Sequence, residues 1–223
     1  MERRQINSAA ELVALVNEFG FIPFLESPVE GFTLKPYVPE ERWFSDGMEG
    51  PWEWKGQGIG RYAYGKLFCR LAGFVSLAYW PFFIAYRRDG YDFEGYYEDG
   101  CASYKAKRIV DALTHNGPML STELKRACGF CKEGESGFDL EIARLQMTTF
   151  VTTEGFAYAI DRHGRPYGWG IARYALTEQA FGEDFVRSAQ RISPVQAKET
   201  LLLRARELCP DARDKALEKL IKA

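Results

Sequence analysis

The chain has 223 residues, of which 46% are hydrophobic and 15% aromatic, enough apolar material for one large core or two small ones. Its formal net charge of −2 excludes a protein that binds polyanions over its whole surface, and no apolar run approaches the roughly 18 residues of a membrane span. Five cysteines are an odd number without framework spacing, and the N-terminus has no apolar signal region. We therefore expect reduced thiols and a cytoplasmic location.

The charges are unevenly distributed along the chain. Residues 1–54 carry 4 basic and 10 acidic groups, a net charge of −6, whereas residues 55–126 carry 11 basic and 7 acidic groups, a net charge of +4. A neutral protein with this asymmetry can present one basic face, as modest nucleic-acid binders do.

The N-terminal region, residues 1–100, begins with a helix from about Ser8 to Phe19, which Ser8 caps and Gly20 ends. Residues 22–60 contain five prolines, which predict an irregular segment. Three tryptophans lie within twelve residues of this segment. Because large indole rings bury much apolar surface, a core beneath this segment is favoured over a platform on which bases stack. Both interpretations stay open. The tryptophans are Trp43, Trp52 and Trp54.

A second helix is expected from about Ala72 to Tyr86, followed by the acidic loop "RRDGYDFEGYYEDG". Tyr91 and Phe93 stand where an EF-hand needs ligands, so this loop predicts no calcium site. The pair Cys128 and Cys131 matches CxxC, but no second pair and no suitably spaced histidine accompanies it. No metal ion and no cofactor are expected.

Residues 101–182 show a recognisable order of elements. Helices are expected from Ser103 to about Leu113, from Ser121 to Gly129, and from Asp139 onward. The stretch "YAIDRHGRPYGWGIARY", residues 158–174, then alternates apolar and polar residues on both sides of a glycine-containing turn. Three helices followed by a hairpin predict a winged helix, although the connection between its second and third helices is longer than the usual tight turn.

The hairpin turn is basic, and most charged turns are simply solvated. In a winged helix, however, this tip would lie beside a phosphate backbone, where its arginines could pair with phosphate oxygens. Residues 183–223 are expected to form two short helices that are hinged at Pro210 and capped by Ser193 and Asp211. The fold class is thus α+β and mostly helical, with residues 1–100 either irregular or a second, degenerate winged unit.

With this order, the chain resembles the AlkZ/YcaQ-type DNA glycosylases, winged-helix proteins that excise bulky alkylated purines and unhook interstrand crosslinks. The segments "ELVALVNEFGFIPFLES", "PEERWFSDGMEGPWEWK" and "FVSLAYWPFFIAYRR" are similar to the first helix and its extension, the aromatic acidic segment and the arginine-rich helix of that family. The resemblance covers most of residues 10–181. It implies double-stranded DNA as the partner and a role in DNA repair.

The catalytic motif of that family is not retained. The resemblance places a glutamine, an apolar residue and then aspartate or glutamine where this chain has Ile22-Pro23-Phe24-Leu25. Glu26 lies one place further on and is a weak candidate for a base that activates water, although Pro23 makes this role unfavourable. Gln57 and Gln146 do not replace the motif, and contact or packing is expected of Gln146. Other acids nearby are Glu40, Glu41, Asp46, Glu49 and Glu53.

Three functions remain open. The first is a DNA-binding relative of these glycosylases without their glutamine-based catalysis, the second a divergent glycosylase, and the third a protein-interaction module. The expected DNA contacts are Arg144, Arg162, His163 and Arg165, with Lys105, Lys107 and Arg108 on the backbone, and the candidate stacking residues are the three tryptophans. The partner is duplex DNA in the first two cases and a protein in the third, and the sequence predicts no oligomeric state.

Overall fold

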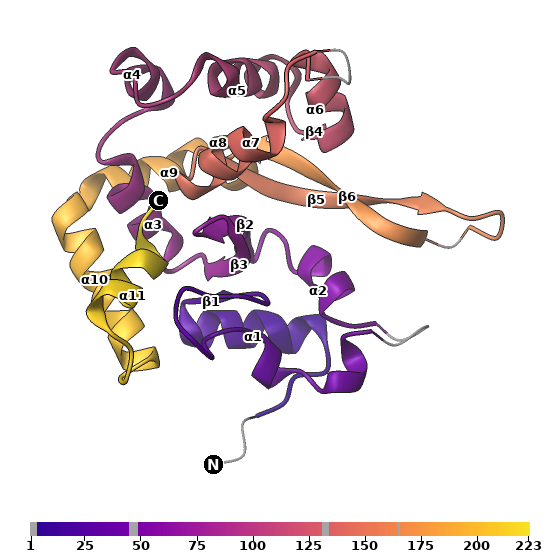
Figure 1. The fold of residues 1–223 in the computed structure, drawn as a ribbon, viewed down its shortest axis with the longest axis vertical. Coiled ribbons are helices and arrows are strands. Elements are labelled where there is room, and N and C mark those ends of the chain that lie inside the picture. Colours follow the sequence, from indigo (N-terminus) through magenta and orange to yellow (C-terminus); the bar gives the residue numbers. More distant parts are fainter. Residues whose placement is uncertain (1–3, 45–48, 131–133, 165) are drawn as a thin grey trace.

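The computed structural model describes residues 4–44, 49–130, 134–164 and 166–223. Within them the chain is a mixed α+β protein with two small antiparallel sheets among helices (Figure 1). The N-terminal elements are α1 (Ala9–Phe19), β1 (Phe21–Pro23), η1 (Lys35–Tyr37), η2 (Glu40–Arg42), α2 (Pro51–Gln57), β2 (Tyr62–Phe68), β3 (Leu71–Ser76) and α3 (Trp80–Arg88). The central elements are α4 (Phe93–Glu98), α5 (Tyr104–Asn116), β4 (Met119–Leu120), α6 (Ser121–Ala127), α7 (Phe138–Met147), β5 (Val151–Ile160) and β6 (Pro166–Leu176). The last elements are α8 (Thr177–Phe181), α9 (Glu183–Ser188), η3 (Ala189–Arg191), α10 (Pro194–Leu208) and α11 (Asp214–Ile221).

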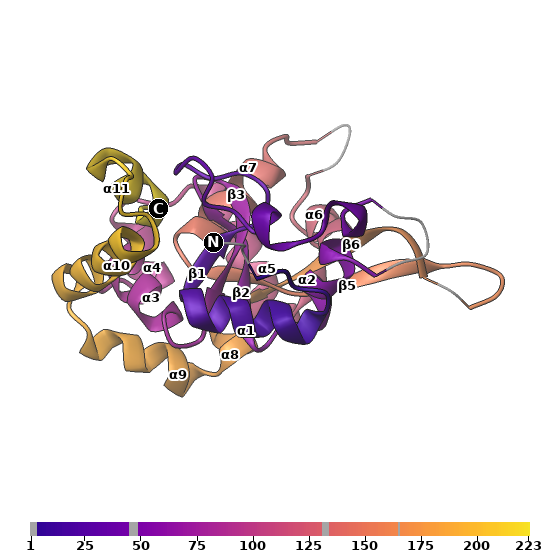
Figure 2. The ribbon, with the colours of Figure 1, turned by 90° about the horizontal axis from the view of Figure 1, so that it is seen from below.

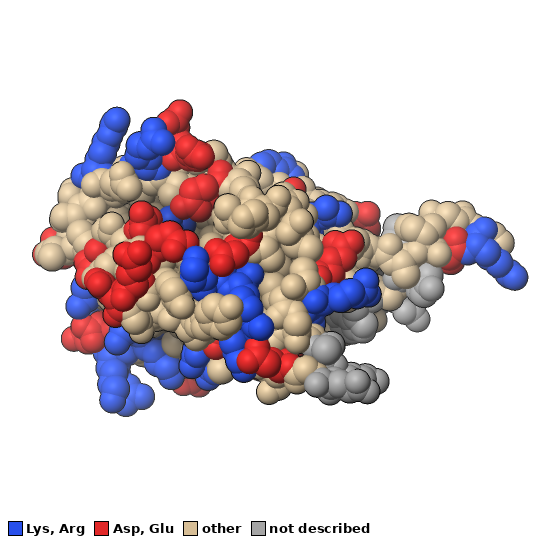
Figure 3. All heavy atoms as spheres, turned by 90° about the horizontal axis from the view of Figure 1, so that it is seen from above, with Lys and Arg blue, Asp and Glu red and all other residues tan. Residues whose placement is uncertain are grey.

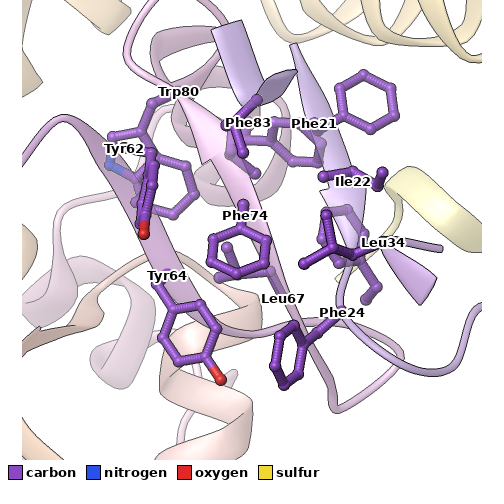
Figure 4. Close-up of a cluster of buried hydrophobic side chains, with 14 of the residues drawn as sticks. Phe21, Ile22, Phe24, Leu34, Tyr62, Tyr64, Leu67, Phe74, Trp80 and Phe83 are labelled. Carbon is purple, nitrogen blue, oxygen red and sulfur yellow. The ribbon is translucent and has the colours of Figure 1, made fainter. Parts of the chain in front are cut away.

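The first sheet has the strand order β1-β3-β2 and lies inside the N-terminal core. Its middle strand places Phe74 among aromatic rings, with the Tyr62 and Tyr64 rings each 5.0 Å from it and that of Phe24 5.7 Å away (Figure 4). Pro23 pairs with Gly73 at the end of β1, an edge strand, where the missing N–H of proline is tolerated.

The expectation of a helix from about Ala72 is wrong in its first half. Residues up to Ser76 form β3, which pairs with β2, and the helix begins only at Trp80. The two residues between the strands, Cys69 and Arg70, both have positive φ, at 52° and 67°. These dihedral angles are those of a tight hairpin turn, but the turn lacks the asparagine and glycine that usually occupy it.

Several predicted helix boundaries are confirmed. The Ser8 side chain accepts a hydrogen bond from the Glu11 N–H at the start of α1, and Gly20 ends that helix with φ 82°. Ser103 caps α5 through the Ala106 N–H, and Ser193 caps α10 through the Gln196 N–H. The last helix begins later than expected, because Arg213 and not Asp211 precedes α11.

Two hydrophobic cores organise these elements. The first joins α1, the β1-β3-β2 sheet and α3 to buried residues of α10 and α11, among them Leu201, Leu217 and Ile221. Both views show α10 and α11 beside α3 (Figures 1 and 2). The second core lies between α4, α5, α6, α7 and the β4-β6-β5 sheet, with Ile109 and Val151 fully buried. The C-terminal helices therefore complete the N-terminal core.

Consecutive arginines at the end of α3 connect the parts of the chain. The buried Arg87 guanidinium donates to the carbonyls of Leu67 (2.7 Å), Met147 (3.1 Å) and Ile221 (2.9 Å). Met147 and Ile221 are the last residues of α7 and α11, so one cation binds the C-terminal ends of two helices, where the helix dipoles favour positive charge. Burial lowers the pKa of Arg87, and these carbonyls favour its charged form.

Arg88 holds the segment that follows α7. It donates to the backbone carbonyl of Thr149 (2.8 Å) and pairs with Glu178 (2.5 Å). Thr149 has φ 64°, which is unusual for a β-branched residue, and the Thr177 hydroxyl also donates to its carbonyl (2.5 Å). The strained residue is thus fixed from two sides, immediately before β5 begins.

The β5-β6 hairpin leaves the body of the molecule as a long two-stranded ribbon (Figures 1 and 2). Its base pairs with β4 and contacts β2. Register shifts occur between Thr153 and Gly155 and between Ala157 and Ala159, which mark bulges that increase the twist of the ribbon. The outer half of the hairpin lies away from both cores.

Candidate nucleic-acid interface

The tip of the hairpin presents basic side chains to solvent. Asp161 accepts a hydrogen bond from the backbone N–H of His163 (2.8 Å), and Gly164 has φ 78°, which a turn of this kind requires. Arg162 and His163 are exposed, with the Arg162 Nε 3.0 Å from the His163 Nε2. Arg165 lies outside the described residues.

The expected backbone contacts on α5 are occupied by groups of the protein itself. Lys107 pairs with Glu94 (2.9 Å) and Asp111 (3.1 Å), and these two acids raise its pKa. Arg108 pairs with Glu135, and its guanidinium lies 5.5 Å from the Tyr104 ring and 5.3 Å from the Phe130 ring. Lys105 donates to the Ser136 carbonyl (2.9 Å).

Figure 3 shows the face that carries α4, α5 and α6, together with the hairpin. Lysine and arginine side chains alternate with aspartate and glutamate over the body, and at the far end of the hairpin a blue basic group projects beyond a smaller red acidic one. On this face, the basic surface is interrupted between the body and the tip.

Arg144 and Gln146, both on α7, lie in different surroundings. Arg144 is exposed and pairs with the buried Glu141 (3.0 Å), whose other oxygen accepts from the Ser103 hydroxyl (2.9 Å). Gln146 is 1% exposed, accepts from the Lys66 N–H (3.0 Å) and donates to the Thr153 hydroxyl (3.0 Å). Gln146 therefore links β2 to β5, the packing role expected of it.

The tryptophans lie mostly in the core. Trp43 and Trp54 are buried, and the Phe24 ring packs 5.4 Å from that of Trp43. Trp52 is half-buried and lies 5.0 Å from the Phe24 ring. Of these three indoles only that of Trp52 reaches the surface, which agrees with the interpretation that the tryptophans form a core beneath this segment.

The segment Ile22-Pro23-Phe24-Leu25, where the resemblance predicts a catalytic motif, belongs to the hydrophobic core or packs against it. Ile22 of β1 is fully buried and Phe24, the residue after β1, is 2% exposed, so neither side chain offers a polar atom to a ligand. Glu26 is exposed in the following loop. Of the other acids, Glu40 and Glu41 are in η2, Glu49 is exposed, Glu53 accepts from the Gly50 N–H (2.8 Å), and Asp46 lies outside the described residues.

Cys128 is buried, and burial raises the pKa of its thiol. Its Sγ donates to the Arg108 carbonyl (3.4 Å), a packing role. Its CxxC partner, Cys131, lies outside the described residues.

A cavity of about 750 Å³ lies between α3, α9 and the start of α10, apart from the hairpin tip. Arg88 and Glu178, which pair with each other, form part of its wall, as do Arg187 and Glu183. None of the expected DNA contacts lines this cavity. Its wall carries two arginines, Arg88 and Arg187, and three carboxylates, Asp92, Glu178 and Glu183, so it has no excess of positive charge for an anion.

Lys55, a buried residue that the sequence did not single out, lies where α2 meets the hairpin. The lysine is 8% exposed, and its Nζ donates to the Trp52 carbonyl (2.5 Å) and lies 4.3 Å from the centroid of the Phe156 ring. Burial lowers the pKa of Lys55 to about 8, although the nearby Glu53 raises it. The one sequence signal is the Trp52 to Lys55 spacing of three residues in a helix, which brings the two side chains to one face.

The fold and the surface define a small α+β protein with a projecting basic hairpin. The family model described as AlkZ related matches residues 6–222, so the chain belongs to the AlkZ-related family. The resemblance predicted from the sequence is thereby confirmed over nearly the whole chain. No curated protein and no solved structure matches it. In the described part of the chain, no helix is long and apolar enough to cross a membrane.

Proposed function

We propose that this protein binds duplex DNA through the β5-β6 hairpin and does not use the glutamine-based catalysis of AlkZ-type glycosylases. On this proposal α5, α6 and α7 with the β4-β6-β5 sheet are a winged helix, and the hairpin is its wing. The observation that carries the proposal is the projecting ribbon with Arg162 and His163 exposed at its end. A ribbon of this shape can follow a groove while its tip contacts phosphates.

The arrangement of charges supports the tip over α5 as the main contact. Lys107 and Arg108 already have carboxylate partners, which a phosphate would have to displace. Arg162 has no such competitor among the ion pairs of the described residues. Arg144 and Lys105 are secondary contacts, and of Trp43, Trp52 and Trp54 only Trp52 is placed to touch a base.

The family relationship supports a role in DNA repair, with recognition of altered duplex and not base removal as the step performed. Ile22 and Phe24 are buried where the family places polar catalytic residues, which supports the absence of that chemistry. We place the protein in the cytoplasm, which agrees with the four free thiols of the described residues, Cys69, Cys101, Cys128 and Cys209.

The test is fluorescence anisotropy with a labelled duplex over a series of salt concentrations. If Arg162 and Arg165 each contact one phosphate, the double variant Arg162→Ala/Arg165→Ala lowers the slope of log affinity against log salt by about two units. The matched control is Arg191→Ala/Arg213→Ala, which removes the same charge from exposed positions outside the hairpin and should leave the slope unchanged. Equal slopes for wild type and hairpin variant would refute the proposal.

Two other functions would give different results, one in this binding experiment and one in an assay of base release. The alternating charges over α4–α6 favour a protein-interaction module, and absence of any salt-dependent duplex binding would select it. Release of a methylated base from an alkylated duplex, lost in Glu26→Gln with the fold intact, would select a divergent glycosylase. We expect no release, because Glu26 is an exposed carboxylate next to a buried apolar strand.

A further inference from the structure

The root of the β5-β6 hairpin rests on both cores. Val151, Tyr174 and Leu176 belong to the second core or pack against it. Among the hydrophobic hairpin side chains that the structure describes, Phe156 alone packs against the first core. Phe156 lies further out along β5 than Val151, so the groups that hold its ring set the direction in which the ribbon leaves the body.

Lys55 of α2, which lies beside the hairpin in both views, is the cation against this ring (Figures 1 and 2). Its Nζ is 4.3 Å from the centroid of the Phe156 ring and 5.5 Å from that of Trp52, whose carbonyl accepts its hydrogen bond (2.5 Å). None of the ion pairs among the described residues includes Lys55. Burial lowers its pKa to about 8, which leaves most of the amine protonated at neutral pH. Because the residue is only 8% exposed, little solvent competes with the attraction between this cation and the ring.

Gly56, the next residue of α2, lets β5 approach this helix closely. A Cβ at this position would lie 3.3 Å from the Phe156 ring and 4.0 Å from the Tyr158 hydroxyl. The backbone of Gly56 is helical, so its conformation does not require glycine, and glycine makes a helix less stable than alanine does. What the glycine provides is therefore the close contact with Phe156.

We propose that Lys55 is a positioning residue for DNA binding: its cation holds the Phe156 ring against α2 and so fixes the direction of the hairpin. Gly56 sets the distance between the helix and the ribbon. The inference rests on the proposed function of the hairpin tip. The Lys55 amine is buried and already has a carbonyl acceptor, so it acts on DNA through Phe156 and not as a phosphate contact.

The length of the ribbon magnifies any change of direction at Phe156. Arg162 is six residues further along the chain, a span of at most roughly 20 Å at about 3.3 Å per residue. A rotation of roughly 10° about Phe156 moves the tip by roughly 3.5 Å, close to the rise of about 3.4 Å between successive phosphates of one DNA strand. A ribbon that is already held in one direction loses little freedom on binding, whereas a loose one must be ordered at a cost in affinity.

The first variant is Lys55→Met in the full-length protein, which keeps an unbranched side chain and removes the charge. Its affinity for a labelled duplex, measured by fluorescence anisotropy at one salt concentration, should fall about three- to tenfold. The slope of log affinity against log salt should stay within about half a unit of the wild-type value, because no phosphate contact is lost. Lys55→Arg keeps a cation beneath the ring and should restore most of the affinity. Lys215→Met, at an exposed lysine of α11, is the matched control and should change neither quantity. A slope lower by about one unit in Lys55→Met would mean that Lys55 contacts a phosphate itself, and would overturn the inference.

The second variant, Gly56→Ala, tests the same contact without changing the charge. Its new Cβ displaces the Phe156 ring, so duplex affinity should fall by about threefold or more, while the better helix former offsets the cost of that displacement and the urea midpoint changes little. Gly155→Ala is the matched control on β5, because a Cβ there meets no atom within 4 Å. Full affinity in Gly56→Ala, or an equal loss in Gly155→Ala, would contradict the inference. Should Lys55→Met fail to fold, this pair decides instead.

Residual dipolar couplings measure the direction of the ribbon without DNA. In the wild type, the couplings of the β5 and β6 amides should fit one alignment tensor together with those of α5 and α10. In Lys55→Met the hairpin couplings should be reduced, whereas those of α5 and α10 stay unchanged, a difference that a general loss of stability would not produce. Unchanged hairpin couplings in Lys55→Met would refute the positioning role.

These outcomes separate the inference from the proposed function. Salt-dependent binding by the wild type with the same affinity in Lys55→Met would overturn the positioning role and leave DNA binding intact. No salt-dependent binding by the wild type would overturn the proposed function, and with it the role of Lys55 in DNA binding. The dipolar couplings would then still show whether Lys55 holds the hairpin.

Discussion

Arg87 and Arg162 are the same residue type in two regions of the molecule with opposite surroundings. Arg87 is buried where α3, α7 and α11 meet, and four backbone carbonyls accept its hydrogen bonds, those of Leu67, Met147, Ile221 and Lys222. Arg162 is exposed at the end of a ribbon that leaves the body, and its Nε lies 3.0 Å from the Nε2 of the adjacent His163. A basic residue thus contributes to the fold where the protein supplies hydrogen-bond acceptors for it. Where the protein supplies none, the residue is available to a partner.

The largest effect is expected at the buried end of this comparison. Arg87→Met keeps much of the apolar stem but leaves four carbonyls without this donor, and the hydrogen bonds to two of them, those of Leu67 and Ile221, are buried. An unsatisfied buried group costs about 1–3 kcal/mol. We expect the free energy of unfolding in urea to fall by about 3 kcal/mol or more. The control Arg191→Met, at an exposed position, should change it by less than about 0.5 kcal/mol. A similarly small change at Arg87 would mean that water replaces the guanidinium.

The second contact between the two cores should have a smaller effect. Gln146→Leu removes the acceptor of the Lys66 N–H and the donor to the Thr153 hydroxyl, both in or near buried positions. We expect a loss of about 1–3 kcal/mol in the same urea titration, because the buried Thr153 hydroxyl loses its donor and the partly buried Lys66 N–H loses its acceptor. Gln57→Leu, at an exposed glutamine, is the matched control. An unchanged midpoint for Gln146→Leu would show that the junction does not depend on this side chain.

Lys55 lies between the two extremes, and its effect should depend on pH. Burial places its folded pKa at about 8, below the ordinary value of 10.5, so the unfolded chain binds more protons between these values. The cost of burying the charge is present in full below pH 8 and is relieved as pH rises toward 10.5. The charged group that acts on the amine is Glu53 on the same helix. On the packed strands burial raises the pKa of Tyr64 and Tyr158, which favours their neutral forms.

Comparison with Lys55→Met isolates this contribution. The stability of the wild type relative to the variant should increase as pH rises from about 8 to 10, and should be flat from about 6 to 7.5. Urea midpoints of both proteins at a series of pH values give the difference directly. A difference that falls over the upper range would mean that the lysine gains, and does not lose, proton affinity on folding.

The smallest effect on stability is expected at the tip. Arg162→Ala alone should shift the free energy of unfolding by no more than about 0.5 kcal/mol, since the side chain is exposed in a turn. Thermal denaturation followed by circular dichroism measures it. A clear loss of stability would show that Arg162 is structural, and would remove the contrast with Arg87.

Much of the fold could be predicted because local signals decide it. The cap at Ser8 and the positive φ of Gly20 set the limits of α1, and alternation around Gly164 predicted the hairpin. The β2-β3 hairpin was not predicted, because Cys69 and Arg70 adopt left-handed conformations that are unusual for these residue types. A short buried strand such as Leu71–Ser76 also cannot be distinguished from a buried helix by periodicity.

The candidate site was less accessible to sequence reasoning, because pairing and burial are properties of the folded chain. Lys107 and Arg108 were expected to face phosphates, but Glu94 and Glu135, from other segments, neutralise them. Lys55 gave no sign of burial, since its cover comes from Phe156, about a hundred positions further along the sequence. The basic residues of the turn identified the hairpin tip as a candidate site. Only the three-dimensional structure shows that Lys107 and Arg108 are paired with carboxylates, whereas the exposed Arg162 is in none of the ion pairs of the described residues.

The composition of the two cores has a consequence for synthesis. The core around the first sheet includes residues from Ile6 to Ala85 but also Leu217, Leu220 and Ile221, whereas the core around α5 uses residues 93–176. On a ribosome that adds roughly 5–20 residues per second, the middle of the chain can acquire its native contacts while the beginning still lacks its last helix. The segment made first is thus completed last, and until then its aromatic sheet lacks the cover of α10 and α11.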